Sequence, residues 1–184
     1  RYILGTRGQK PLICVGINPS TAAPDALDPT LQSAQRIALN NGYDSFLMFN
    51  VYAQRATRPD DMERVCNSAL HEENRKAFRY LLSLSETPAI WAAWGNIIEK
   101  RGYLMDCMRD FAADASAANV RLHVFIDAQH GRLTGQRIRD EVPDWREASI
   151  WFCGPPRFGQ ALREDFLAHG LPPERFHQEL FQMR

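Results

Sequence analysis

The amino-acid sequence predicts an α/β protein, a three-layer Rossmann-like domain with a mainly parallel sheet and helices on both faces. Short apolar segments rich in β-branched and aromatic residues alternate with longer segments whose apolar residues recur at helical spacing. Regular alternation of this kind is typical of a parallel sheet buried between two layers of helices. A chain of 184 residues suits one substantial core better than two, so we expect a single α/β domain over residues 1–184.

Six short apolar segments predict the strands, and several of them end at a turn residue such as Gly16 or Gly95. Five intervening segments predict helices, because their apolar residues recur three and four positions apart. The first of these helices should stop at Asn41-Gly42 and the last at Gly170. The strands are expected at residues 12–15, 45–52, 89–94, 121–126, 149–153 and 175–181, and the helices at 30–40, 62–85, 96–116, 138–142 and 158–169.

The turn after the first strand is the main candidate for a ligand site. Asn18, Ser20 and Thr21 follow the strand there and can donate side-chain hydrogen bonds. Free backbone N–H groups beyond the carboxyl end of a parallel strand, and the positive end of a following helix, favour anions such as phosphate. The residues of the same Asn-Pro-Ser-Thr segment are also common in turns and helix caps that bind no ligand. Both interpretations, a ligand site and a structural turn, therefore stay open.

Right-handed crossovers should bring the ends of the other strands to the same edge of the sheet. Asn50, Arg55 and Thr57 lie at the end of the second strand, and Trp94 lies at the end of the third, so each is a pocket candidate. Packing against a helix is the commoner use of a tryptophan. Asp28 precedes the first helix, where a carboxylate caps the first turn; the alternative is that it activates water beside a bound sugar.

Composition and charge argue against several classes of partner. Lys and Arg together number 22, as do Asp and Glu, so net charge favours neither nucleic acid nor anionic lipid. The apolar runs are shorter than a membrane-spanning helix. The four cysteines are widely spaced, which is typical of reduced thiols in a cytoplasmic protein. No metal site is expected, because His71 has no second His or Cys at metal-binding spacing.

Four motifs follow one another in the first two-thirds of the chain. They are Arg1-Tyr-Ile-Leu4, Gly16-Ile-Asn-Pro-Ser-Thr-Ala22 with Asp28-Pro-Thr30, Asn50 with Arg55-Ala-Thr57, and Trp91-Ala-Ala-Trp-Gly95. In this order they resemble the bacterial family called domain of unknown function 1643, over about residues 1–118. That family has no assigned activity. Its Gly-Ile-Asn-Pro turn resembles the first motif of mismatch-type uracil-DNA glycosylases, which implies a nucleobase or nucleotide ligand.

A different set of motifs closes the chain, namely Ile150-Trp-Phe-Cys-Gly-Pro155, Phe158-Gly159 and Phe176-His-Gln-Glu-Leu-Phe181. These motifs resemble the end of the nicotinamide-binding domain of the ferredoxin-NADP reductase family, in particular its ferric-reductase-like branch, over about residues 121–184. The resemblance implies which residues lie beside the nicotinamide of NADP or NAD and which face a flavin. The nicotinamide-side residues would be Cys153, Gly154, Pro155 and Phe158, and the flavin-side residues Glu179 and Phe181.

The two resemblances together imply a fusion or chimera, with one α/β domain built from residues 1–120 and 121–184. Its expected function is to bind NAD(P)H without catalysing a reaction alone, because the chain lacks the flavin-binding barrel of a complete reductase. Flavin would then come from a flavoprotein partner, and Cys153 would orient or shield the nicotinamide. If the protein is an enzyme, it is expected to be a component of an NAD(P)H-dependent oxidoreductase. The alternatives are a nucleotide- or nucleobase-binding protein or hydrolase that uses the turn at Asn18–Thr21, and a folded chimera without activity.

Overall fold

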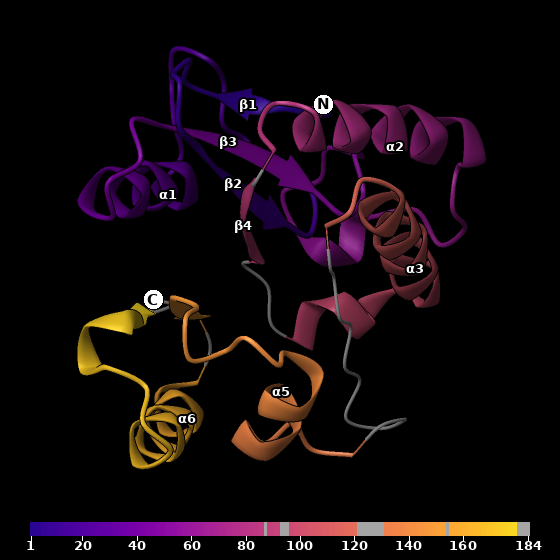
Figure 1. Ribbon diagram of the computed structural model, residues 1–184. Coiled ribbons are helices and arrows are strands. Elements are labelled where there is room, and N and C mark those ends of the chain that lie inside the picture. Colours follow the sequence, from indigo (N-terminus) through magenta and orange to yellow (C-terminus); the bar gives the residue numbers. More distant parts are fainter. Residues whose placement is uncertain (87, 93–95, 121–130, 154, 180–184) are drawn as a thin grey trace. The chain divides into compact units, whose positions relative to one another are not determined.

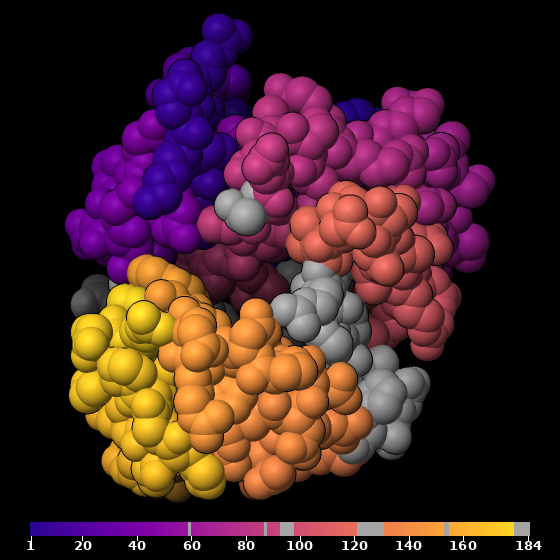
Figure 2. Space-filling view, viewed as in Figure 1, coloured from indigo at the N-terminus to yellow at the C-terminus, as the bar shows by residue number. Residues whose placement is uncertain are grey.

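The computed structural model of the chain describes residues 1–86, 88–92, 96–120, 131–153 and 155–179, and the remaining residues are grey in Figure 1 and Figure 2. The chain divides into two compact units, Arg1–Val124 (unit 1) and Phe125–Arg184 (unit 2). Each unit contains both helices and strands, which confirms the α/β class that the sequence predicts. The units are described one at a time below.

Unit 1 is built on a mixed sheet of four strands (Figure 1). The strands lie in the order β1 (Leu4–Gly5), β3 (Ser45–Asn50), β2 (Pro11–Gly16) and β4 (Ala89–Ala92). Strand β2 pairs in parallel with both β3 and β4, while the short β1 runs antiparallel to β3. In β2 every residue after Pro11 is buried, as expected of a strand covered on both faces.

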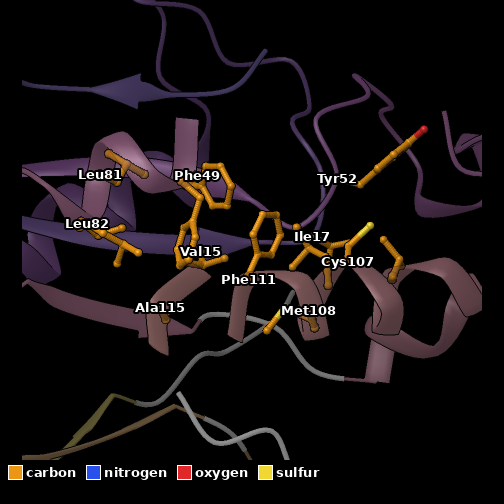
Figure 3. Packing of buried hydrophobic residues seen from close by; sticks show 14 of the residues in the cluster. Val15, Ile17, Phe49, Tyr52, Leu81, Leu82, Cys107, Met108, Phe111 and Ala115 are labelled. Atoms are coloured by element: carbon orange, nitrogen blue, oxygen red, sulfur yellow. The ribbon is translucent and has the colours of Figure 1, made fainter. Parts of the chain in front are cut away.

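Helices cover both faces of this sheet. Helix α1 (Pro29–Asn40) packs on β2 and β3, and helices α2 (Ser68–Leu82) and α3 (Gly102–Ala117) pack together on the opposite face. Two short 3₁₀ helices, Pro59–Asp61 (η1) and Asn96–Lys100 (η2), precede α2 and α3. The alternation of side chains along a strand decides which residues meet which helices. Ile13, Val15, Phe49 and Val51 therefore join one core with residues of α2 and α3 (Figure 3).

Aromatic rings fill the centre of that core. Phe49 of β3 lies 5.4 Å from Phe78 of α2 and 5.3 Å from Phe111 of α3, measured between ring centroids. Phe78 and Phe111 are themselves 4.9 Å apart, so the three rings link one strand to two helices. Tilted and edge-to-face rings at these separations are favourable beyond the area that they bury. Cys14 and Cys107 are buried free thiols, and burial raises the pKa of each to about 12.

Unit 2 has a two-stranded parallel sheet of β5 (Ile150–Cys153) and β6 (Phe176–Glu179). Its helices are α5 (Gly135–Glu141) and α6 (Pro156–Ala168), followed by the 3₁₀ helix Pro173–Arg175 (η3). The core of unit 2 is small and aromatic, and consists of Trp145, Leu162, Phe166, Leu171 and Phe176.

The structure corrects the predicted single sheet, because the described strands form two separate sheets and one of their pairings is antiparallel. The strand expected at residues 121–126 lies outside the described residues. The helix predicted at 62–85 begins only at Ser68, because the side chain of Asn67 accepts a hydrogen bond from the N–H of Leu70 and caps it there. Similarly, the helix predicted at 96–116 is divided into η2 and α3.

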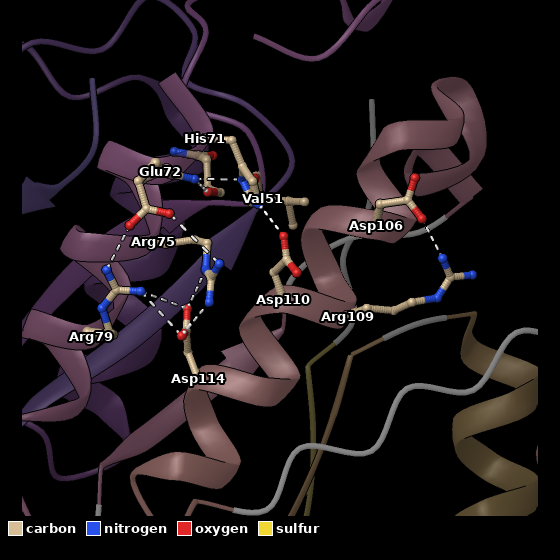
Figure 4. A network of polar contacts seen from close by, with 11 residues as sticks. Val51, His71, Glu72, Arg75, Arg79, Asp106, Arg109, Asp110 and Asp114 are labelled. Atoms are coloured by element: carbon tan, nitrogen blue, oxygen red, sulfur yellow. Dashed lines mark hydrogen bonds and ion pairs between the residues drawn. The ribbon is translucent and has the colours of Figure 1, made fainter. Parts of the chain in front are cut away.

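An ion-pair network joins α2 to α3 (Figure 4). The carboxylate of Asp114 on α3 accepts two hydrogen bonds from Arg75, at 2.9 and 2.8 Å, and longer ones from Arg79. Asp114 is only 8% exposed. The hydrogen bonds from Arg75 hold the pKa of the Asp114 carboxyl below its ordinary value of 3.8, although burial opposes the shift. On the same helix pair, His71 contacts Asp110 at 2.8 Å.

We expect Asp114→Asn to lower the free energy of unfolding by about 2 kcal/mol, because the partly buried side chain of Arg75 would lose the charge of its buried partner. The folded-state pKa of Asp114 is depressed, so its contribution is complete above the ordinary pKa and fades as the pH falls through the lower folded value. Urea unfolding at neutral pH should therefore separate the variant from the parent protein, and the difference should shrink in acid.

The matched control for this variant is Asp106→Asn, which removes the exposed ion pair between Asp106 and Arg109 on the same helix (Figure 4). This change should be small, because exposed pairs one helical turn apart contribute little. Equal losses for the two variants would show that the Asp114 network does not hold α2 against α3.

Candidate functional site

The order of the strands locates the edge of unit 1 at which a ligand would bind. The chain leaves β2, passes through α1 to β3 on one side, and then returns through α2 to β4 on the other side. The helices of these two crossovers lie on opposite faces, so a crevice is expected beyond the carboxyl ends of β2 and β4. The predicted Asn18–Thr21 turn begins at the carboxyl end of β2.

Asn18 ties this turn to the segment that follows β3. Its Nδ2 donates to the carbonyl of Ala56 at 2.7 Å and to that of Pro19 at 3.1 Å. The backbone N–H of Ala56 donates in return to the Pro19 carbonyl at 3.0 Å. Both N–H groups of the Asn18 amide therefore have partners within the protein, which supports the interpretation of the turn as a structural feature.

Arg55 holds the next part of the turn. Its Nε donates to the carbonyl of Ser20 at 2.9 Å, and its Nη2 donates to the carbonyls of Thr21 at 3.1 Å and Ala22 at 3.2 Å. Arg1 also donates to the Ala22 carbonyl from its Nη1. Among the described residues Nη1 of Arg55 has no partner, so part of this guanidinium remains available to a ligand.

Positive charge gathers around the turn. Burial, followed by the positive charge of Arg55, lowers the pKa of the Arg1 guanidinium, while the carboxylate of Asp28 acts in the opposite direction. Two guanidinium groups thus share the neighbourhood with one carboxylate. The local excess of positive charge favours an anion at this edge, although the net charge of the whole chain is zero.

Asp28 caps helix α1. Its Oδ1 accepts a hydrogen bond from the backbone N–H of Leu31 at 3.0 Å, and Pro29 occupies the first helical position. Proline has no N–H to offer a ligand, and the cap occupies a second donor of the first turn. Pro29 and Leu31 therefore offer no free N–H group to an anion, and the structure shows Asp28 in the predicted capping role.

Asn50 is the polar residue at this edge whose side chain has no protein partner. It ends β3 and is 3% exposed, yet its side-chain amide makes no hydrogen bond within the described part of the chain. Gly16 makes room for it, because a Cβ atom there would lie 2.9 Å from Oδ1 of Asn50 and 2.6 Å from Cε of Met48. The amide is not fully sealed from solvent, in contrast to Oδ1 of Asn74.

Asn74 of α2 is a functional candidate that the sequence analysis missed. It is completely buried, and its Nδ2 donates to the carbonyls of Asn50 at 2.9 Å and Val51 at 3.2 Å, which fixes the backbone at the end of β3. The sequence does contain a signal for this role: Asn74 lies at helical spacing from Phe78 and Leu81, and therefore on the buried face of α2. A buried polar side chain needs hydrogen-bond partners.

The other predicted site residues divide between the units. In unit 1, Ser20 is half-buried and Thr57 is exposed, while Trp94 lies outside the described residues. In unit 2, Pro155 is the N-cap of α6 and Phe158 packs edge-on against Phe152, 5.5 Å away. Gly154 and Phe181 lie outside the described residues, as do the side chains of Cys153 and Glu179. Among the predicted residues of the first half, Arg55 bonds to the turn that holds Asn18, Ser20 and Thr21, and Asn50 ends β3 opposite Gly16, two residues before Asn18. We call Asn18, Ser20, Thr21, Asn50 and Arg55 the carboxyl-edge site.

The amino-acid sequence matches a known protein family. The family described as a protein of unknown function, DUF1643, matches residues 1–134. The chain belongs to this family. No curated protein and no solved structure matches the chain.

The DUF1643 match reaches residue 134, beyond the join that was expected near residue 120. The family match therefore continues past the point at which the sequence suggested a segment from another family. No comparison supports a reductase segment in the remainder.

Within the described residues, no helix is long and apolar enough to cross a membrane, and no cluster of three potential metal ligands is found.

We expect Arg55→Ala to loosen the turn at residues 18–22, because the carbonyl groups of Ser20, Thr21 and Ala22 would each lose a hydrogen bond. The free energy of unfolding should fall by about 1 kcal/mol, and the amide of Ala56, which bonds to Pro19, should exchange faster with deuterium. The control is Arg58→Ala, which removes the same charge three residues later from an exposed side chain without a hydrogen bond in the described region. If the Ala56 amide exchanges with deuterium at the same rate in both variants, Arg55 does not restrain the turn.

Proposed function

We propose that unit 1 of this DUF1643 protein binds a nucleotide or a nucleobase-containing ligand at the carboxyl-edge site. The observation that carries the proposal is the side-chain amide of Asn50, which ends β3 opposite Gly16, is 3% exposed and makes no hydrogen bond with the described residues. Polar groups that are largely withdrawn from water usually have hydrogen-bond partners. A ligand that both accepts and donates hydrogen bonds would satisfy this amide, as the edge of a nucleobase does.

The charges around the site support a ligand that carries phosphate. Nη1 of Arg55 is free among the described groups, and Arg1 adds a second guanidinium. Arginine N–H groups form strong, directional hydrogen bonds to phosphate oxygens. The hydroxyl groups of Ser20 and Thr21 lie on the turn that these arginines hold. A base near Asn50 and a phosphate near Arg55 is the arrangement that we propose.

Nicotinamide dinucleotides are members of this ligand class, and NADP or NAD remains our second proposal on the basis of the motifs in residues 150–181. The carboxyl-terminal residues would then contribute through Cys153, Pro155 and Phe158, and Cys153→Ala or Phe158→Ala should weaken binding. In that form of the proposal, a flavoprotein partner supplies the flavin. A hydrolytic form would use the carboxylate of Asp28 to activate water near the ligand.

The test is a calorimetric titration of the protein with AMP, ADP, adenine, NADPH and NADH. We expect saturable binding of at least one nucleotide, and Asn50→Ala should abolish it. Because the Asn50 amide has no hydrogen bond to lose, the same variant should change the free energy of unfolding by only about 1 kcal/mol or less.

Asn40→Ala, at the exposed end of α1, is the matched control and should bind normally. Two results would overturn the proposal: no binding of any of these ligands at millimolar concentration, or unchanged binding by the Asn50 variant. Binding of NADPH that depends on Phe158 but not on Asn50 would instead favour the reductase-like interpretation.

A further inference from the structure

Unit 2 contains a cavity that the proposed function does not use. It has a volume of about 400 Å³ and lies between α6 and the start of α5 with the residues just before it. Helices α5 and α6 pack against each other (Figure 1). The walls combine the apolar residues Leu133, Phe158, Ala161 and Leu162 with the polar residues Arg132, Thr134, Gln136, Arg157 and Asp165. Cavities of this size are typical of sites for small molecules.

The charges that line the cavity do not balance. Arg132 and Arg157 form no hydrogen bond or ion pair with the described part of the protein. The one acidic residue of the lining, Asp165, is already paired with Arg139 and lies 3.7 Å from Nδ1 of His169. Within the described residues, these two guanidinium groups at the cavity therefore have no counter-charge.

The remaining polar groups of the lining are occupied by contacts within the protein. The hydroxyl of Thr134 accepts a hydrogen bond from the N–H of Arg137, and the side chain of Gln136 bonds to Asp140 and Arg139. The start of α6 offers little to an anion, because Pro156 has no N–H and the N–H groups of Phe158 and Gly159 donate to the Pro155 carbonyl. Among the polar side chains of the lining, the two arginines are therefore the ones that remain for an anion.

Gly135 leaves room for the carboxylate of Asp165 where α5 approaches α6. A Cβ atom at Gly135 would lie 1.9 Å from Oδ2 of Asp165, so a larger residue would have to displace this carboxylate, which is paired with Arg139. Arg132, just before α5, and Arg157 of α6 line the same cavity.

We infer that this cavity is a binding site for a small anionic molecule with an apolar body, in which Arg132 and Arg157 bind a phosphate or carboxylate group and Phe158, Ala161 and Leu162 contact the apolar part. The site lies within residues 132–165 and is separate from the carboxyl-edge site of unit 1. Guanidinium groups bind both phosphate and carboxylate in a bidentate manner, so the experiment must distinguish the two.

The experiment is a titration of ¹⁵N-labelled protein, followed by chemical shifts, with phenyl phosphate, benzoate, inorganic phosphate and benzyl alcohol. We expect phenyl phosphate or benzoate to shift the amides of residues 133–136 and 157–162 saturably, and to bind more tightly than inorganic phosphate or the neutral alcohol. Whichever of the two aromatic anions binds more tightly identifies the charged group. Shifts at residues 16–22 would report on the carboxyl-edge site, so the two proposals can fail independently.

Arg132→Gln and Arg157→Gln should each weaken binding by about fivefold or more, since each removes one charge-assisted contact. Arg163→Gln is the matched control, because it removes the same charge from an exposed position on α6 outside the cavity lining. Equal affinity in all three variants would overturn the inference, as would the absence of saturable shifts with millimolar phenyl phosphate and benzoate.

Discussion

The central constraint in unit 1 is the burial of strand β2 between two parallel neighbours. Leu12, Ile13, Cys14 and Val15 are all buried, so β2 must be covered on both faces, and α1 lies on one face with α2 and α3 on the other. The register of β2 beside β3 then sets Gly16 opposite Asn50. The position of the carboxyl-edge site follows from this one pairing.

Most polar side chains at that edge serve the protein itself. Asn18 and Arg55 satisfy backbone carbonyls of a long connection, and Asp28 satisfies the start of a helix. A loop between a buried strand and a helix needs such partners, because its backbone groups are cut off from regular pairing. Asn18, Arg55 and Asp28 thus have structural roles that require no ligand. The described structure shows no such hydrogen-bonding role for the side chain of Asn50.

Unit 2 has a smaller hydrophobic core than unit 1. Among its described residues five form the buried cluster, which is few for a domain, and aromatic side chains supply much of the buried surface. Trp145 lies edge-on to Phe166 at 5.4 Å, and a cavity between α5 and α6 is lined by Arg132 and Arg157, which have no partner among the described residues. The proposed ligand contacts thus differ between the units: the Asn50 amide in unit 1 and two exposed guanidinium groups in unit 2.

The local pattern of the sequence was sufficient for the fold class, the positions of most helices and strands, and the turn after β2, since periodicity, caps and turn residues act over a few positions. The Asn67 cap shortened α2, and the division of the strands into two sheets was not predictable, because pairing joins residues that are distant along the chain. The sequence also suggested Asn18, Arg55 and Asp28 as ligand contacts. Only the tertiary structure showed that Asn18 and Asp28 bond to groups of the protein, and that Arg55 does so through Nε and Nη2 and not through Nη1 among the described residues. Tertiary structure likewise left the Asn50 side chain without a partner in the described part of the chain and set Arg132 and Arg157 on one cavity. The physical reason is that whether a polar group is free depends on which distant groups the fold brings to it.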